Sequence, residues 1–308
     1  MGSAAACLRS IKSFIPPPGA DRSRVKGMAG GAVADVARWP RAQVRHIRWA
    51  APSIGRILGV ALIAALLSAW ELSVRLQWIV SDSWPSVSAV LLAGVGGILS
   101  GELLTVLGST LARAGAGYVC GVLSGAILGL LFATSSLARR LFSPLMELLR
   151  PIPVPAIVPP LVLLLGVQDA MKVTVVALTV VFPVLTNMVQ GVLAVDATVL
   201  GVARTFHVGK LATIWKIILP ATLPYLLAGM RVSLSLALIV TVVAEMIAGN
   251  QGIGHYLVLM QYAVRPQEMY ASILLLAFSG YLLNRIFVKI EKRLIHWYLL
   301  TDTRQVMT

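Results

Sequence analysis

Two sets of polar side chains interrupt long apolar stretches, and their types suit reversible hydrogen bonding rather than covalent chemistry. Each set recurs every three to four residues or at multiples of a turn, which places it on one face of a helix. Because polar groups are costly in a bilayer, they usually face a bundle interior or a water-filled path. Two interpretations stay open with equal weight: the faces line a path where hydroxyl groups bind an anion weakly, or they bond helices together. The sets are Thr179, Thr186, Asn187 and Gln190, and Arg231, Ser235, Thr241 and Glu245.

Glu245 is the single residue with the most specific prediction, because an ionised carboxylate in an apolar segment needs a positively charged or hydrogen-bonding partner. Arg113 or Arg265 could supply the positive charge from the same end of the chain's apolar segments. A structural ion pair is favoured over a contact with a solute. If a solute is anionic, Arg113 is the better candidate to attract it, unless it only marks the edge of its helix.

The sequence contains no motif for a disulfide framework, a metal site, ATP binding or membrane-embedded catalysis. Cys7 and Cys120 are far apart, and the four histidines are isolated from one another and from acidic clusters, so no disulfide framework or metal site is expected. There is no G-x-x-x-x-G-K-[ST] loop for ATP, no H-E-x-x-H, and no Ser-Lys or paired-Asp arrangement for a membrane-embedded enzyme.

The composition is that of a polytopic membrane protein. Of 308 residues, 58% are hydrophobic and only 12% are charged, whereas about a quarter of the residues in soluble domains are charged. The net charge of +14 does not indicate nucleic-acid binding, because the basic residues alternate with apolar spans and form no stripe with interleaved aromatics. Residues 1–53 are predicted to be a basic, partly disordered arm that is not a cleaved signal peptide.

The apolar segments predict an all-α bundle of about six transmembrane helices, since a helix needs about 20 residues to cross a hydrocarbon core. The second span carries a glycine every four residues, which predicts close packing with another helix. The third is predicted to be broken, because the prolines of residues 150–160 cannot all lie in a regular helix. The predicted spans cover residues 54–74, 114–133, 161–167 with the preceding proline segment, 173–193, 223–247 and 270–288.

The distribution of positive charge sets the expected orientation. Lys and Arg concentrate in both terminal segments and in the connections at 139–150 and 204–216, whereas the other connections hold only Lys172 and Arg265 as loop cations. By the positive-inside rule, both termini and the 204–216 connection are expected in the cytoplasm.

The 204–216 connection lies in a wider stretch, residues 201–224, which is the one long basic and polar interruption late in the chain. Apolar residues at helical spacing predict two short amphipathic helices with a bend near Gly209. Leu219-Pro220 is expected to end the second helix, because proline lacks an amide hydrogen and disfavours helix in the residue before it.

The same stretch resembles the cytoplasmic "EAA" loop of permease subunits of binding-protein-dependent ABC importers. Counting back from Pro220 without gaps, the family's glutamate falls on Gly201 and its glycine on His207, so Gly209 is expected to take over the turn. The resemblance implies a coupling helix seated in a groove of the ATPase, with Phe206 and Trp215 buried and Arg204 and Lys210 at the rim. Trp215 could instead anchor the chain at the membrane interface. The implied coupling residues are Ala203, Arg204, Thr205, Phe206, His207, Gly209, Lys210, Trp215, Leu219 and Pro220.

Further motifs extend the resemblance over residues 84–290, to the permeases of nitrate, sulfonate, taurine and related importers. They include Trp84-Pro85-Ser86, Gly108 to Arg113, Arg150 to Pro153, Phe182-Pro183-Val184 and Ala244-Glu245-Met246 followed by Gly252-Ile253-Gly254. The resemblance implies a type I importer fold in the bacterial inner membrane, with residues 104–300 as the core permease, 54–103 as a first helix and periplasmic connection, 197–220 as the coupling loop and 301–308 as a cytoplasmic tail.

The partners implied by this family are two ATPase subunits, a periplasmic solute-binding protein, a second permease copy or paralogue, and membrane lipid, but no nucleic acid. ATP and Mg would be bound by the ATPase and no cofactor by this chain, which would not be an enzyme. A self-contained secondary carrier is the alternative, although it would want buried coupling-ion carboxylates and usually related halves. The sequence leaves the substrate open among small solutes, most of them anions.

Overall fold

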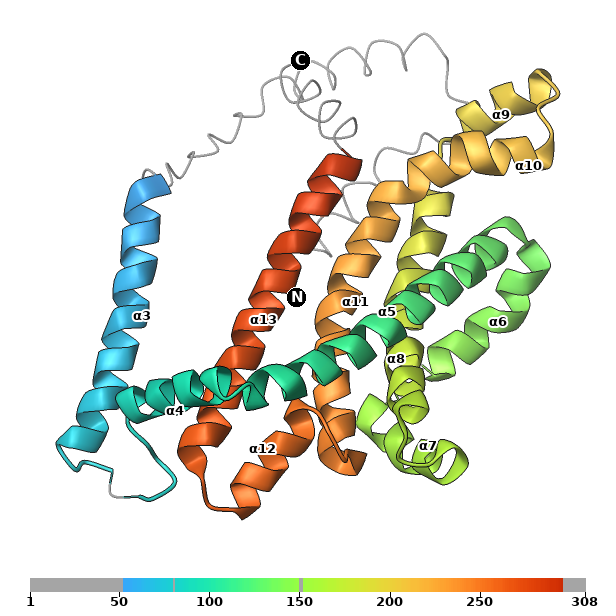
Figure 1. Ribbon diagram of the computed structural model, residues 1–308. Coiled ribbons are helices and arrows are strands. Elements are labelled where there is room, and N and C mark those ends of the chain that lie inside the picture. Colours follow the sequence, from blue (N-terminus) through green and yellow to red (C-terminus); the bar gives the residue numbers. More distant parts are fainter. Residues whose placement is uncertain (1–51, 80, 150–151, 296–308) are drawn as a thin grey trace, which may run out of the picture. The chain divides into compact units, whose positions relative to one another are not determined.

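The computed structural model describes residues 52–79, 81–149 and 152–295, and every regular element among them is helical (Figure 1). The predicted basic arm lies almost wholly outside these residues, as do the C-terminal tail and Arg150-Pro151. The chain divides within α3 (Pro52–Arg75) into a unit that ends at Leu62 and a second unit that begins at Ile63. Of the first unit, only the beginning of α3 is described, and its apolar side chains are exposed.

The second unit contains all the other described elements. They are α4 (Val87–Leu99), α5 (Glu102–Thr134), α6 (Ser136–Leu149), the 3-10 helix η1 (Val154–Ile157), α7 (Val158–Leu165), α8 (Asp169–Leu193), α9 (Ala197–Thr205), α10 (Lys210–Thr213), the π-helical turn η2 (Ile214–Ile218), α11 (Leu219–Ala248), α12 (Ile253–Tyr262) and α13 (Pro266–Leu294).

Five of the described helices are long and apolar enough to cross a membrane: residues 57–75, 102–134, 169–193, 210–248 and 266–294. These match five of the six predicted spans, and the all-α fold class is confirmed. The predicted third span has no single helix of sufficient length. Residues 154–165 form only a short apolar segment, made of η1 and α7.

The glycine face of α5 packs against α8, as its spacing predicts. A Cβ on Gly117 would lie 2.6 Å from the Cβ of Val176, and one on Gly129 would lie 2.7 Å from the Cβ of Met188. Any side chain on these glycines would therefore push the two helices apart. Because the contacts advance in the same direction along both chains, α5 and α8 run parallel.

Two parallel neighbouring helices require the chain to return between them. It does so through α6, η1 and α7, which lead from the end of α5 back to the start of α8 (Figure 1). Prolines lie within this return, Pro144 in α6 and Pro159 at the start of α7. The predicted broken third span is therefore a crossing in pieces rather than one interrupted helix.

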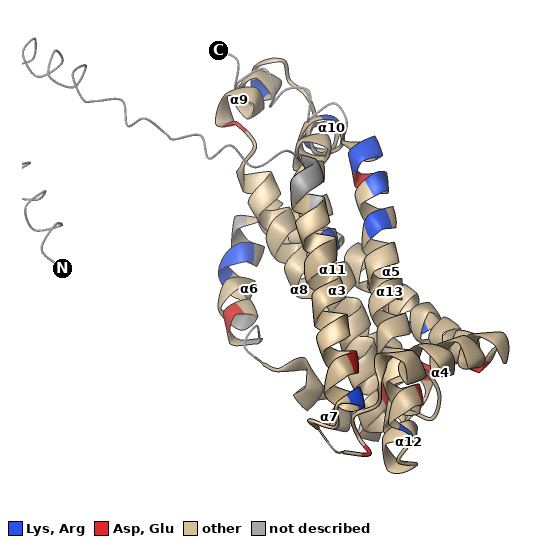
Figure 2. Cartoon of the chain, turned by 90° about the vertical axis from the view of Figure 1, so that its left-hand side faces the viewer, with Lys and Arg blue, Asp and Glu red and all other residues tan. Residues whose placement is uncertain are grey.

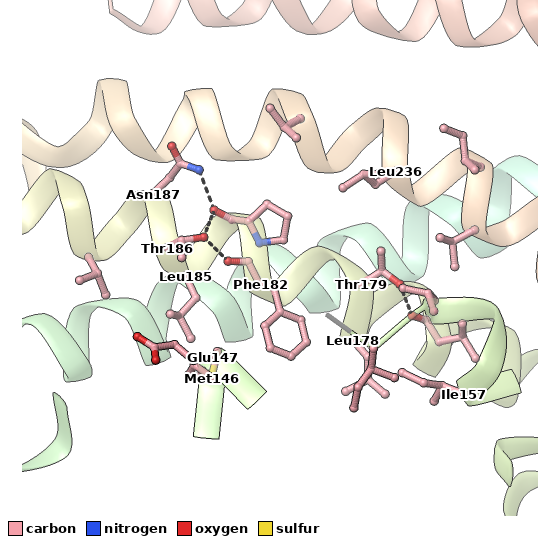
Figure 3. Close-up of a pocket in the computed structure, with 18 of the residues that line it drawn as sticks. Met146, Glu147, Ile157, Leu178, Thr179, Phe182, Leu185, Thr186, Asn187 and Leu236 are labelled. Carbon is pink, nitrogen blue, oxygen red and sulfur yellow. Dashed lines mark hydrogen bonds between the residues drawn. The ribbon is translucent and has the colours of Figure 1, made fainter. Parts of the chain in front are cut away.

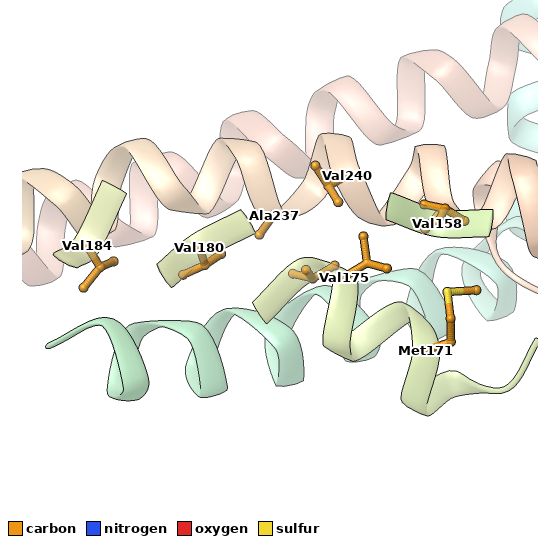
Figure 4. Packing of buried hydrophobic residues seen from close by; sticks show 9 residues of the cluster. Val158, Met171, Val175, Val180, Val184, Ala237 and Val240 are labelled. Carbon is orange, nitrogen blue, oxygen red and sulfur yellow. The ribbon is translucent and has the colours of Figure 1, made fainter. Parts of the chain in front are cut away.

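The buried core forms where α8 meets α11 and η1–α7 (Figure 4). Val175, Val180 and Val184 of α8 are fully buried and pack with Ala237 and Val240 of α11. Gly229 of α11 approaches Asn187, while Gly191 of α8 approaches Tyr225. The order of these contacts is reversed along the two chains, so α11 is antiparallel to α8.

The prediction that Pro220 ends a helix is wrong, because residues 210–248 form one continuous helical stretch. In η2 the helix widens by one residue, and the amide of Leu219 donates to the carbonyl of Ile214, five residues earlier. A proline in a regular helix clashes with the carbonyl four residues before it, and a π-turn changes that geometry. The proline is thus accommodated, and α10 is joined directly to the long α11.

Candidate functional site

The connection between α8 and α11 is a helical hairpin whose turn is made by His207. Its φ is +54°, the left-handed region that histidine enters more readily than most residues. The amide of Val208 donates to the carbonyl of Ala203 (2.9 Å) and closes the turn. Gly209 has a φ of −59° and precedes α10 as its N-cap. The expectation that Gly209 takes over the turn is therefore wrong, because the left-handed residue is the one aligned with the family's glycine.

The hairpin carries apolar side chains that no described residue covers. Phe206 is 77% exposed and Trp215 is 64% exposed, and Val202 and Leu211 are exposed beside them. Arg204, Thr205 and Lys210 are exposed as well, whereas Ala203 is buried within the hairpin. We call Val202, Phe206, Leu211 and Trp215, with Arg204 and Lys210, the α9–α10 surface; its mixture of apolar centre and basic margin is typical of a protein interface.

A side-chain cap fixes the start of α9. The Asp196 carboxylate accepts a hydrogen bond from the backbone N–H of Thr198 (2.7 Å). This backbone bond, with a further bond to the Thr198 side chain, holds the pKa of Asp196 below its usual value. The carboxylate is therefore ionised at neutral pH, as a cap beside the N-terminal dipole requires.

A cavity of about 790 Å³ lies between α6, η1–α7, α8 and α11 (Figure 3). The four polar residues predicted on α8 all line it: Thr179, Thr186, Asn187 and Gln190. The remaining lining is largely apolar. Whether a solute passes along this wall stays a prediction.

Three of the α8 side chains on this wall donate hydrogen bonds to the backbone of their own helix. The hydroxyl of Thr179 donates to the carbonyl of Val175 (2.8 Å), and that of Thr186 donates to Phe182 and Pro183 (3.2 Å to Pro183). The Asn187 amide nitrogen donates to Pro183 (2.8 Å). The two hydroxyls thus present acceptor lone pairs to the cavity, and the Asn187 amide keeps one N–H donor. The expectation that these groups bond an anion stays a prediction.

The second predicted set, on α11, does not line this cavity. There α11 contributes Val232, Leu236, Ile239, Val240 and Val243. Arg231 pairs with Glu291 of α13, Ser235 borders a separate pocket beside Asn284, and Thr241 is buried with its hydroxyl on the carbonyl of Ala237. The polar residues of α11 and those of α8 therefore do not line the same cavity, and the expectation that both sets line a solute path stays a prediction.

Glu245 is fully buried near the end of α11 that lies opposite the α9–α10 surface, and its partner is Arg113. Arg113 Nη1 donates to Glu245 Oε1 (2.8 Å), Thr110 Oγ1 donates to Oε2 (2.8 Å), and the amide of Gly254 donates to Oε2 (3.1 Å). Arg265, the other predicted partner, instead pairs with Glu268. The geometry supports the structural ion-pair interpretation, because the carboxylate has no exposed surface.

The network continues from Arg113 to α8 and to the turn after α11. Arg113 Nε donates to Asp169 Oδ1 (2.7 Å), and its Nη1 also donates to the carbonyl of Gln251 (3.0 Å). The buried Lys172 lies 3.8 Å from Asp169 and donates to Asn250 (3.2 Å). We call Thr110, Arg113, Asp169, Lys172 and Glu245 the Arg113 network; its two cations and two carboxylates balance in charge.

Two glycines let the turn approach the network. Gly252 has a φ of +103°, and a Cβ there would strike the carboxylate of Glu245. A Cβ on Gly254 would lie 2.7 Å from the Cβ of Glu245. The predicted motif Ala244-Glu245-Met246 followed by Gly252-Ile253-Gly254 thus has a physical explanation. The two glycines leave room for the Glu245 side chain, and the Glu245 carboxylate accepts a hydrogen bond from the Gly254 amide.

Sequence reasoning missed Thr110, Asp169 and Lys172 as members of this network. Thr110 lies three residues before Arg113, and its hydroxyl accepts from the amide of Ile253 (2.8 Å) while it donates to Glu245. The signal was the one-turn spacing from Arg113, but the partner is more than 130 residues away in the sequence.

Comparison with known proteins was decisive. Residues 121–296 match the family described as "Binding-protein-dependent transport system inner membrane component". The putative aliphatic sulfonates transport permease protein SsuC of Bacillus subtilis (strain 168) is 30% identical over 243 residues, covering 79% of this chain and 88% of that relative. The chain belongs to this family of permeases.

Other members support the assignment. The taurine transport system permease protein TauC of Escherichia coli (strain K12) is 27% identical, with 82% of this chain and 94% of the relative covered. The nitrate import permease protein NrtB of Leptolyngbya laminosa is 27% identical, with 75% and 84% covered. The chain is thus a permease subunit of an ABC importer, a transport subunit that is a multi-pass protein of the inner membrane. The alternative of a self-contained secondary carrier is not supported.

Solved structures share the fold. An inward-facing structure of the MetNI methionine ABC transporter matches with a TM-score of 0.56 at 16% identity, over 62% of this chain and 95% of that one. An amino acid ABC transporter crystallised with histidines matches with a TM-score of 0.53 at 18% identity, over 64% and 95%. The predicted type I importer fold is confirmed by these permease structures.

Proposed function

We propose that this permease forms the membrane path for a small oxyanion, delivered by a periplasmic binding protein and moved by ATP hydrolysis on separate ATPase subunits. The solute class follows from the names of the relatives, which specify sulfonates, taurine and nitrate. The observation that carries the coupling to an ATPase is the α9–α10 surface, with Phe206 and Trp215 exposed on a hairpin between two core helices.

The α9–α10 surface is mechanically connected to the core. α10, η2 and α11 form one continuous stretch over residues 210–248, so a displacement of Trp215 is transmitted along α11. Burial of a few aromatic side chains usually supplies most of the binding energy of an interface. Phe206 and Trp215 would fill the ATPase groove, with Arg204 and Lys210 as rim contacts. The competing role of Trp215 is that of an anchor at the membrane interface.

Charge supports an orientation with the α9–α10 surface in the cytoplasm. At that end, Lys and Arg gather on the last turns of α13 and on α6, α9 and α10 (Figure 2). At the opposite end, the described cations Arg75, Arg113, Lys172 and Arg265 each pair with a carboxylate. The positive-inside rule counts Lys and Arg, and the described chain carries nine of them at the α9–α10 end against four at the opposite end, so the α9–α10 end is expected inside. The set at the α9–α10 end comprises Arg139, Arg140, Arg204, Lys210, Lys216, Arg285, Lys289, Lys292 and Arg293.

The cavity beside α8 is the proposed path through the membrane. Its largely apolar lining with scattered polar groups suits passage without tight binding. The assembly would contain two ATPase subunits and a second permease copy or paralogue, with both termini of this chain in the cytoplasm. ATP and Mg would be bound by the ATPase, and this chain would bind no cofactor.

Reconstitution tests the proposal. The permease is placed in proteoliposomes with the ATPase and binding protein encoded beside it, and uptake of taurine, ethanesulfonate and nitrate is measured with and without ATP. We expect uptake of at least one of these anions that requires both partners and ATP. Uptake of a solute against its gradient without an ATPase would contradict the proposal.

A further inference from the structure

Arg139 is a charged residue on the cavity wall that the function described so far does not use. It lies on α6, one turn after the end of α5, and it is half-buried where it borders the cavity. The only other described charged residue on that wall is Glu147 of the same helix. Arg139 is thus the single described cation that a solute in the cavity can reach.

Two contacts hold Arg139 in place. Its Nε donates to the carbonyl of Phe132 (3.3 Å), and its Nη2 donates to the carbonyl of Ala133, both in the last turn of α5. Phe132 stacks on Phe142 of α6, with ring centroids 4.9 Å apart. The end of α5 and the start of α6 therefore form a packed corner that fixes the guanidinium beside the cavity.

These contacts leave part of the guanidinium free for a ligand. A guanidinium has N–H groups on Nε, Nη1 and Nη2, and only Nε and Nη2 bond to the described chain. Nη1 keeps both of its N–H donors. An oxyanion bound there would receive charge-assisted hydrogen bonds, which are about twice as strong as neutral ones.

The uncommitted donors of the cavity gather at the same end. Ser143 lies one turn after Arg139 on α6, and Gln190 lies near the end of α8, and neither side chain bonds to a described group. Gly129 packs on Met188, so residues 132–139 and residue 190 lie at one level of the parallel α5–α8 pair. Deeper in the cavity, the hydroxyls of Thr179 and Thr186 donate to the backbone and offer only acceptors, while Asn187 donates one N–H to Pro183 and keeps the other.

We propose that Arg139, with Ser143 and Gln190, is the specificity-determining anion contact of the cavity, at the end near the α9–α10 surface. The inference rests on the proposed function, since it assumes that the solute is an oxyanion. Glu147 lies two turns further along α6, about 12 Å in rise, and repels an anion from that side. The anion is thus stabilised at Arg139 alone among the described charges of the wall.

Substitution of Arg139 by glutamine separates the charge from the structural role. A glutamine amide can still donate to the carbonyls at the end of α5, but it carries no charge. The control is Arg140→Gln, a neighbouring exposed arginine that does not line the cavity. Each variant is reconstituted with the ATPase and binding protein, and uptake of taurine, ethanesulfonate and nitrate is measured with ATP hydrolysis in the same vesicles.

We expect Arg139→Gln to lower the maximal rate of anion uptake by about tenfold or more, as loss of a hydrogen bond to a charged group implies. Assembly with the ATPase and basal ATP hydrolysis should be unchanged, and Arg140→Gln should behave as wild type. Arg139→Lys should restore most of the uptake, because it restores the charge. These results together would support the anion contact.

Other outcomes overturn it. If the wild type takes up the anions and Arg139→Gln takes them up equally well, the role of Arg139 is refuted and the proposed function stays intact. If Arg139→Gln does not assemble, the test rests on Arg139→Lys: a lysine variant that assembles but takes up no anion would show that positive charge at this position does not support uptake, and would refute the anion contact. Failure of the wild type to take up any of the three anions would instead contradict the proposed function.

Discussion

The two ends of α11 show opposite uses of side-chain chemistry. At one end, Glu245 has no exposed surface and its carboxylate bonds Arg113, Thr110 and the turn at Gly254. At the other, Phe206 and Trp215 expose most of their surface on a hairpin with no described partner. The buried charges have found their partners within the chain, whereas the exposed rings have not.

The difference indicates which end is fixed and which is made for contact. The Arg113 network joins α5, α8, α11 and the turn before α12, so these elements keep one register at that end. The α9–α10 surface is continuous with α11 through the helical stretch of residues 210–248. A force applied at this surface would therefore move helices that are held together at the opposite end.

The largest expected effect comes from breaking the network. Arg113→Ala leaves the buried Glu245 without its countercharge, and removal of one partner of a buried ion pair costs about 3–5 kcal/mol. Arg75→Ala is the matched control, because both pairs are 2.8 Å long while the arginine side chains are 6% and 67% exposed. We expect a large fall in the unfolding temperature of the purified protein for Arg113→Ala and little change in it for Arg75→Ala. Equal shifts would mean that the network does not stabilise this end.

Gly252→Ala should follow in size. It adds a side chain at a positive φ, which lowers the stability by about 1–3 kcal/mol. It also drives a Cβ into the carboxylate of Glu245. Gly101→Ala provides the comparison, because Gly101 also has a positive φ (+80°) but open space around its Cβ. Thermal unfolding of both variants compares them, and the difference contains the clash with Glu245 together with the larger backbone cost at Gly252, whose ψ is 172° against −7° at Gly101. No difference between them would argue against close contact between the turn and Glu245.

A smaller effect is expected at the hairpin turn. His207→Gly removes the strain of a non-glycine residue in the left-handed region and should stabilise the turn by about 1 kcal/mol. His207→Val should destabilise it, and Gly209→Ala should change little because its φ is −59°. Hydrogen exchange of the Val208 amide, which bonds Ala203, reports each change. If the Val208 amide exchanges more slowly in Gly209→Ala than in His207→Gly, His207 is not the left-handed residue of the turn.

The smallest effect concerns acid pH. Because the pKa of Asp196 is lowered by its bond to the Thr198 amide, the cap stabilises α9 at neutral pH and is lost as the pH falls through the lowered pKa. We expect the protection of the Thr198 amide, measured relative to its intrinsic exchange rate at each pH, to fall at acid pH in wild type. Asp196→Asn keeps an acceptor without titrating, so its exchange should lack this acid-dependent step; an identical step in that variant would exclude Asp196 as its source.

The spans, the glycine face of α5 and the position of the hairpin could be predicted, because each depends on local composition and spacing. The orientation of α11 could not, since this helix is apolar nearly all round and periodicity does not show which side meets α8. Thr110 could not be assigned to Glu245 either, because that contact joins residues 135 positions apart. At Pro220 the local rule failed because a π-turn, invisible in the sequence pattern, changes the helix geometry before the proline.

The central claim is that the α9–α10 surface is the site at which the ATPase drives the permease. Co-purification of the ATPase with Phe206→Ala, with Trp215→Ala and with the double variant tests it most directly, with Phe278→Ala of α13 as the control for loss of an exposed phenylalanine (63%). We expect each single variant to weaken the complex by about 2 kcal/mol, the scale of an interface hot spot, the double variant to lose it, and Phe278→Ala to retain it. Normal recovery of the ATPase with the double variant, and normal ATP-dependent uptake, would contradict the account.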